Sequence, residues 1–198
     1  MNLPFSKNQL FQKAYQAADI HSSLTNQITH LINGTRKNSQ SLVVVCIGSD
    51  RSTGDALGPL TGTALQQYKS SNFKIYGTLK DPVHALNLAD TINEINDSYR
   101  HPFIIAIDAC LGKTTSVGNI QANAGPIYPG AGVNKKLPPI GDVHITGIVN
   151  VGGFMEYIVL QNTRLFLVQE MAHIISACLY RSLTTMTYQH PAVNITIR

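Results

Sequence analysis

Charged residues are scarce in this chain of 198 residues: they make up 13% of it, about half the share of roughly 25% that globular proteins usually carry. Fifteen Lys and Arg residues stand against eleven Asp and Glu residues, which gives a net charge of +4. No basic run is longer than two residues, as at Arg36-Lys37. The sequence therefore lacks the basic patch typical of nucleic-acid binding, and we expect no nucleic-acid partner.

Long apolar runs are also missing. The longest, over residues 165–180, is interrupted by Gln169, Glu170 and His173 and is shorter than the ~20 residues that a membrane helix needs. The first residues contain no apolar segment of the secretory type. The cysteines are odd in number and form no CxxC or zinc-binding pattern: Cys46, Cys110 and Cys178. We therefore expect a cytoplasmic protein with reduced thiols and no membrane partner.

Apolar residues, in contrast, make up 43% of the chain, enough for a substantial core. Continuous apolar, β-branched runs predict strands buried on both faces at 42–47 and 103–107. Further strands are expected at 73–76 and 143–151, with an edge strand at 193–197.

Helical periodicity alternates with these strands, at residues 7–33, 57–68, 83–96 and 163–183. Glycine and proline are frequent over 111–142, which predicts loops and a hairpin around 119–123. This alternation predicts an α/β fold with a mainly parallel sheet.

Neither a repeat nor a linker divides the chain. We expect a single domain over residues 1–198, with a helical N-terminal extension at 1–38 and an α/β core at 40–198.

Because carboxylates are few, each can be inspected. Eight lie where a solvated helix face, a turn or a helix start explains them, which leaves Asp50, Asp55 and Asp108 beside the ends of buried strands. Groups beyond the carboxyl ends of parallel strands meet in one crevice, so Asp55 and Asp108 could face each other. Two carboxylates in one site share a proton, and such a pair can activate water with one member and protonate the leaving group with the other. The structural alternatives are that Asp55 caps the next helix and that Asp108 caps a turn.

Other candidate groups near these positions are Cys110 and two histidines. Cys110 is either a nucleophile or a core thiol. His84 stands at the start of the expected helix 83–96, and His144, at the start of the expected strand 143–151, would reach the crevice if that strand ran antiparallel. Two aspartates and a histidine would then suit a divalent transition metal.

Several common catalytic motifs are absent: GxSxG, HExxH and a GxGxxG after a strand. The loop 48–55 has the glycines of a phosphate cradle, but Asp55 stands where that cradle would carry a lysine. A carboxylate there repels phosphate, which disfavours nucleotide binding.

The segment at residues 46–59, CIGSDRSTGDALGP, resembles the signature of the YyaC-type family of sporulation proteins. The likeness covers roughly residues 42–183 and continues in further segments: 76–85, 107–112, 125–133, 141–150 and 152–164. This family is related to the germination protease of spores and, more distantly, to hydrogenase maturation peptidases. The resemblance implies a three-layer α/β/α sandwich with a mainly parallel, mixed sheet, and a peptidase-like core.

The resemblance also implies residue roles. It carries the two aspartates of the germination protease onto Asp55 and Asp108 as catalytic residues. The loop between the strand and Asp55 is expected to bind substrate, through Asp50, Arg51, Ser52, Thr53 and Gly54. Maturation peptidases use a Glu, an Asp and a His to sense nickel; Asp55, Asp108 and His144 stand as counterparts, which leaves open a nickel or zinc ion.

These roles imply a sporulation-associated endopeptidase in the cytoplasm of a forespore or sporulating cell. Its partner would be a protein or peptide, with small spore proteins as candidates, and an oligomer is compatible with the sequence. Two alternatives are an inactive peptidase fold that binds or regulates a sporulation partner, and a metal-assisted maturation peptidase.

Overall fold

Six strands form one mixed sheet in the computed structural model, which describes residues 10–37, 39–130 and 137–185. The strands are β1 (Phe11–Ala14), β2 (Leu42–Cys46), β3 (Lys74–Tyr76), β4 (Phe103–Gly112), β5 (Asn119–Ala124) and β6 (Val143–Val151). Their order across the sheet is β1-β5-β6-β4-β2-β3. Strands β3, β2, β4 and β6 are parallel, whereas β5 runs antiparallel to both of its neighbours, β6 and β1.

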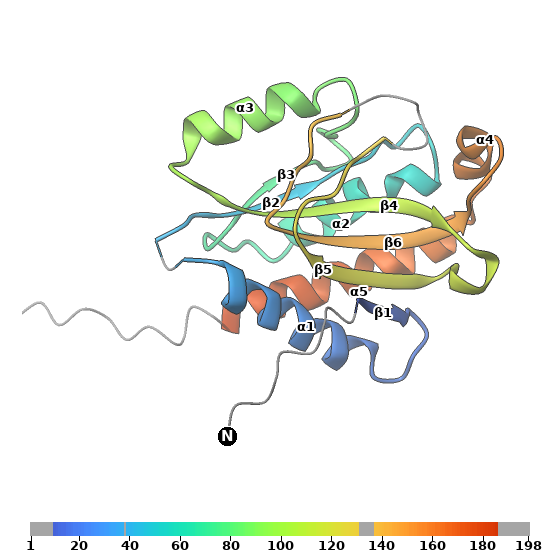
Figure 1. The fold of residues 1–198 in the computed structure, drawn as a ribbon, viewed down its shortest axis with the longest axis horizontal. Helices are drawn as coiled ribbons and strands as arrows, with labels where there is room; N and C mark the ends of the chain where they lie inside the picture. The colour runs from blue at the N-terminus through green and yellow to red at the C-terminus, as the bar shows by residue number, and fades with distance from the viewer. Residues whose placement is uncertain (1–9, 38, 131–136, 186–198) are drawn as a thin grey trace, which may run out of the picture.

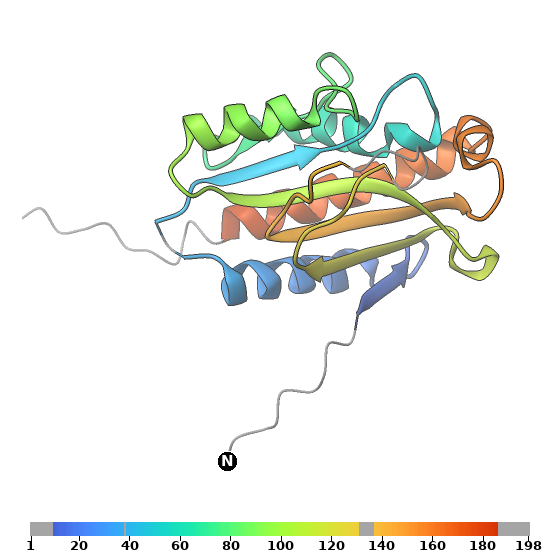
Figure 2. The same cartoon turned by 45° about the horizontal axis from the view of Figure 1, so that its top comes forward.

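Helices cover both faces of the sheet (Figures 1 and 2). The helices are α1 (Ile20–Thr35), α2 (Leu57–Gln66), α3 (Leu88–Ser98), α4 (Glu156–Gln161) and α5 (Leu165–Thr185), with 3-10 turns η1 (Gly54–Ala56) and η2 (Thr114–Ser116). The core on one face includes residues from α1, α2 and α5, and that on the other residues from α3 and the segment 127–140. The predicted three-layer α/β/α sandwich with a mainly parallel, mixed sheet is confirmed.

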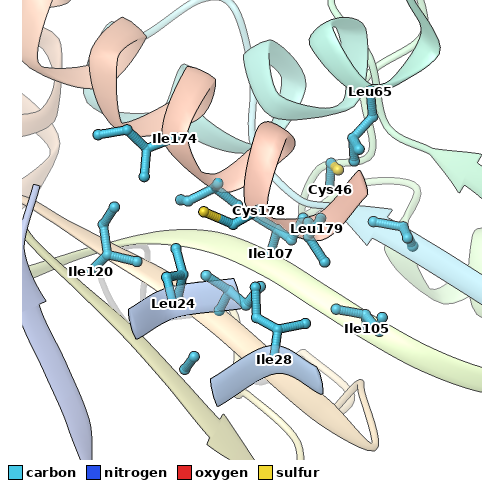
Figure 3. Packing of buried hydrophobic residues seen from close by; sticks show 14 of the residues in the cluster. Leu24, Ile28, Cys46, Leu65, Ile105, Ile107, Ile120, Ile174, Cys178 and Leu179 are labelled. Carbon is cyan, nitrogen blue, oxygen red and sulfur yellow. The ribbon is translucent and has the colours of Figure 1, made fainter. Parts of the chain in front are cut away.

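Strand β2 shows why the sheet is buried on both sides. Val44 and Cys46 face the core shared with α1 and α5, while Val43 and Val45 face the core shared with α3. Successive side chains of a strand point to opposite faces, so a continuous apolar run is needed where both faces are covered. Figure 3 shows this packing, with Leu24 and Ile28 of α1 opposite Cys178 and Leu179 of α5, and Cys46 and Ile107 of the sheet nearby.

The N-terminal region differs from the prediction of a helix over 7–33. Residues 11–14 form β1, which pairs with β5, and α1 begins only at Ile20. Gln, Lys and Ala favour helices when isolated, but here the backbone completes the ladder of β5 and Phe11 donates its N–H to Asn123 Oδ1 at 3.1 Å. The expectation of a wholly helical segment is therefore wrong for β1.

Two further differences concern the sheet. Residues 119–124 form β5 between β1 and β6 rather than a hairpin on themselves, and β4 continues to Gly112, five residues beyond the strand predicted there. The edge strand expected at 193–197 lies outside the described residues. None of the helices within the described ranges is long and apolar enough to cross a membrane.

Candidate active site

Asp55 is presented by a loop that folds back on itself after β2. Gly48 has a φ of +141°, and a Cβ at this residue would lie 1.9 Å from the backbone oxygen of Asp55, so only glycine fits. Gly48 N–H donates to Val83 O at 2.8 Å, and Ser49 N–H donates to Asp55 O at 3.2 Å. Helix α2 has Ala56 as its N-cap and no side-chain cap, so Asp55 is not the cap of that helix.

Asp108 lies within β4 rather than after its end. The strand register pairs Ile107 with Cys46, the last residue of β2, and pairs Asp108 with Thr146 of β6. Asp108 therefore comes one residue beyond the end of β2, at the edge from which the Asp55 loop departs. Its Oδ1 accepts a hydrogen bond from Ala109 N–H at 2.8 Å.

Both carboxylates line one cavity of about 340 Å³. Four further polar groups share its wall: Cys110 from β4 itself, and His84, Thr146 and Glu156 from three other segments. The rest of the lining is mostly apolar and includes Ile47, Leu111, Ile127, Leu137 and Leu160. Asp55 and Asp108 thus lie in one cavity, as predicted. The walls of this cavity are mostly apolar.

The surroundings give the two carboxyl groups different pKa values. Burial raises the pKa of Asp108 well above its usual value, and the negative charge of Asp55 raises it further, against the hydrogen bond from Ala109. Burial also raises the pKa of Asp55, but a backbone hydrogen bond from Ser49 and attraction to His84 oppose the increase. Asp108 is therefore the member that keeps a proton, and Asp55 is the member that more readily ionises.

Cys110 lies beside this pair but is not activated. Burial raises the pKa of its thiol to about 11, in spite of a hydrogen bond with Thr146, and the charge of Asp108 adds to the increase. A nucleophilic cysteine requires a thiolate near neutral pH. The surroundings of Cys110 favour the neutral thiol instead.

The loop residues expected to bind substrate do not line the cavity, although Gly48 and Asp55 on either side of them do. Asp50 and Arg51 are exposed, and Ser52 and Thr53 are partly buried. Gly54 is buried against α4: a Cβ there would lie 2.8 Å from Leu160 Cδ2. The structure thus gives Gly54 a packing contact rather than a place in the cavity wall.

His144 also lies apart from the aspartates. Strand β6 is parallel to β4, so His144 pairs with Ala106, two residues before Asp108, and its Nδ1 donates to Gly125 O at 2.8 Å. The antiparallel direction that would bring His144 to the crevice is not the one observed. Within the described ranges, no group of three or more His, Cys, Asp and Glu side chains is placed to hold a metal ion.

Sequence reasoning gave no role in the cavity to two of its polar residues, His84 and Glu156. His84 follows Val83, which forms a parallel bridge with Ile47 and so continues the sheet next to the Asp55 loop. The residues before it, Lys80-Asp81-Pro82-Val83, contain a single β-branched residue, which is too little to predict a bridge to the sheet. Glu156 begins α4, and only the position of that helix over the cavity gives it a place there.

Comparisons with known proteins agree with this architecture. Residues 12–178 match the family described as "Protein of unknown function (DUF1256)". The chain is 57% identical over 160 residues to "Uncharacterized protein YyaC" of Bacillus subtilis (strain 168), a match that covers 80% of this chain and 77% of the relative.

A solved structure shares the fold. The chain is similar to a [NiFe] hydrogenase maturation protease, HycI from Thermococcus kodakarensis KOD1, with a TM-score of 0.51 and 17% identity. The similarity covers 79% of this chain and 98% of that protein. The chain therefore shares the fold of this maturation protease, as the family resemblance implied.

Proposed function

The chain belongs to the DUF1256 family, and we propose that it is an endopeptidase in which Asp55 and Asp108 together activate water. The observation that carries the proposal is the shared cavity, in which the charge of Asp55 raises the pKa of Asp108. Two carboxyl groups whose surroundings separate their protonation states are suited to act as base and acid in one reaction.

In the first step, the Asp55 carboxylate takes a proton from a water molecule while the water oxygen attacks the carbonyl carbon of the peptide bond. The Asp108 carboxylic acid donates its proton to the carbonyl oxygen, which gives a neutral tetrahedral diol. The apolar walls of the cavity strengthen both proton transfers because they keep the local dielectric low.

In the second step, Asp55 gives its proton to the leaving nitrogen as the carbon–nitrogen bond breaks. Asp108 takes a proton back from one hydroxyl group of the diol, and a carboxylic acid and an amine leave. The pair returns to its starting protonation state, so no group is consumed other than water.

Exposed apolar residues near the cavity support the proposal that the substrate is a polypeptide. Tyr128 lines the cavity and is 71% exposed, and Leu86, two residues after His84, is 74% exposed. Apolar side chains gathered at an open cavity favour a chain that passes across it rather than a small polar ligand. Small spore proteins are the first substrates to test, because residues 46–59 resemble the sporulation family signature.

The test is incubation of the purified protein with small spore proteins, followed by mass spectrometry of the fragments. Asp55→Asn and Asp108→Asn should each reduce cleavage at least about a thousandfold, whereas Asp97→Asn on the exposed face of α3 should not change it. Parallel reactions with Ni²⁺, Zn²⁺ or a chelator determine whether a metal contributes.

Two results would contradict the proposal. Cleavage that persists in both aspartate variants would remove the pair from the mechanism. Stable binding of spore proteins without cleavage by any form would instead support the alternative of a binding protein with a peptidase fold.

A further inference from the structure

A cluster of large apolar side chains lies exposed beside the cavity. All come from residues 151–166, at the end of β6, along α4 and at the start of α5, and each is more than a third exposed: Val151, Phe154, Met155, Tyr157, Ile158, Leu165 and Phe166. Phe154 reaches 82% and Tyr157 59%. We call these seven residues the 151–166 patch. Figure 1 shows α4 beyond the end of β6, on the way to α5.

The patch is larger than isolated exposed residues account for. Aromatic side chains present about 150–250 Å² when fully accessible, so Phe154, Tyr157 and Phe166, which are 55–82% exposed, alone present about 400 Å², and four further apolar residues add to this. The largest apolar patch of an ordinary monomer is about 300–600 Å², and a stable protein interface buries about 800 Å² on each partner. The 151–166 patch therefore has the size of a binding surface.

The surface is mainly apolar, with Gln161, Asn162 and Arg164 exposed among its apolar residues. Only two charged residues occur between residues 151 and 166, Glu156 and Arg164. Arg164 lies over the ring of Phe166 at 5.6 Å, and Glu156 lines the cavity. A partner for this surface must accordingly bring apolar side chains.

The patch adjoins the candidate active site through one short helix. Glu156 and Leu160 of α4 line the cavity, and residues four apart lie on the same face of a helix. Tyr157 and Ile158 lie on the other faces of α4 and are exposed. Helix α4 therefore contributes both to the cavity wall and to the exposed apolar surface.

The local backbone holds this arrangement in place. Met155 adopts a left-handed conformation with φ of +51°, which is unfavourable for a residue with a side chain. Asn150 Nδ2 donates to Val159 O at 3.3 Å and to Thr163 Oγ1 at 3.2 Å, which ties α4 to the end of β6. The segment that carries the patch is therefore tied to β6 near the C-terminal end of α4.

We infer that the 151–166 patch binds an extended, apolar segment of the substrate protein next to the peptide bond that is cleaved. The inference rests on the proposed function, and it narrows the substrates to proteins that offer an unfolded apolar segment. Continuity with the cavity favours this occupant over a second copy of the chain.

The test measures binding separately from cleavage. Fluorescein-labelled, reduced and carboxymethylated α-lactalbumin serves as a permanently unfolded probe, and its anisotropy is followed with the Asp55→Asn protein. Adding Phe154→Ser and Tyr157→Ser should weaken binding at least tenfold. The matched control is Leu10→Ser, which removes an apolar residue that is 70% exposed next to β1 and should leave binding unchanged. Folded α-lactalbumin should not compete for the probe.

Unchanged affinity in the double variant would overturn the inference. So would sedimentation that shows a dimer converted to monomers by the double variant while probe binding persists, because the patch would then join two copies. Thermal unfolding of the double variant should match that of the parent, since both side chains are mostly exposed. If the patch binds the probe but no form cleaves protein, the endopeptidase proposal fails and the binding surface stands. If the patch variants both cleave and bind normally, the inference about the patch fails and the endopeptidase proposal stands.

Discussion

Two aspartates with the same side chain acquire different chemistry from their surroundings. Asp108 lies in the middle of β4, where burial and the charge of Asp55 both favour its protonated form. Asp55 stands in a turn, where Ser49 and His84 stabilise its charge. In the proposed mechanism, this difference gives Asp108 the acid role and Asp55 the base role.

The dependence of activity on pH follows from that assignment. Activity requires an ionised Asp55 and a protonated Asp108, so kcat/KM should be bell-shaped. Attraction to His84 lowers the pKa of Asp55, so His84→Gln should move the acid limb of the profile to higher pH. The profile is measured on a fluorescent peptide for both proteins; an acid limb that stays in place or moves down contradicts this role for His84.

Replacing Asp108 should increase the stability of the protein although it reduces activity. Because the pKa of Asp108 is higher in the folded than in the unfolded protein, its contribution to stability falls as pH rises from the unfolded value towards the folded one. Asp108→Asn should therefore raise the melting temperature at pH 7 by about 2–4 °C, the shift that roughly 1 kcal/mol produces in a chain of this length. At pH 3 the gain should disappear, since Asp108 is then protonated in both states. Equal gains at the two pH values, measured by calorimetry, would show that burial of the charge is not the cause.

At the residue scale, the sequence predicted that Asp55 and Asp108 share a crevice, although it placed Asp108 after its strand rather than within β4. The two residues meet because Asp108 lies one residue beyond the end of β2, at the edge from which the Asp55 loop departs. The sequence was not sufficient for His144, whose position depends on the direction of β6, a property of strand pairing that residue order does not encode. His84 and Glu156 reach the cavity only through the packing of a bridge and a short helix.

Among the elements, α4 has the most direct bearing on function, because it forms one wall of the cavity and carries part of the 151–166 patch. The turn η1 fixes its position through Gly54, whose missing side chain lets Leu160 and Thr163 approach. Gly54, in the segment predicted to bind substrate, thus affects the cavity by setting the position of α4, which forms part of its wall.

Gly54→Ala tests that contact. The added Cβ would lie 2.8 Å from Leu160 Cδ2 and 2.9 Å from Thr163 Oγ1, so α4 must shift. Overpacking of this kind should reduce stability by about 1–3 kcal/mol and raise KM for protein substrates. Gly34→Ala is the matched control, because a Cβ there meets nothing within 4 Å near the end of α1; it should stabilise by up to about 1 kcal/mol without changing KM. Equal denaturation midpoints for the two variants would contradict the packing role.

Strand β1 illustrates the limit of element prediction from sequence. Its residues have helix-forming character, and its strand conformation is due to pairing with β5, more than a hundred residues away. The long buried strands β2 and β4 were predictable because both of their faces require apolar residues.

At the scale of the whole molecule, α1 belongs to the same core as the sheet and α5. Leu24, Ile28 and Ile32 of α1 are at most 1% exposed and pack in the cluster that contains the apolar residues of α5. Apolar residues at every fourth position give α1 the stripe that this packing needs. Helix α1 is thus part of the main core.

Leu24→Ala should therefore destabilise the protein as one unit, by about 2–5 kcal/mol, with a single unfolding transition. Urea denaturation followed by circular dichroism and by tyrosine fluorescence measures this, and the two probes should coincide. An early separate transition that involves only helix loss would show that α1 unfolds independently of the sheet.

The measurement that bears most directly on the central claim is a carbon-13 NMR titration of the aspartate carboxyl groups, with Asp108 assigned by its loss in Asp108→Asn. A proton-sharing pair predicts that Asp108 titrates well above the usual aspartate range, and that Asp55→Asn moves its midpoint down while burial still keeps it raised. An Asp108 that titrates in the usual range, or at the same pH with and without Asp55, would contradict the account.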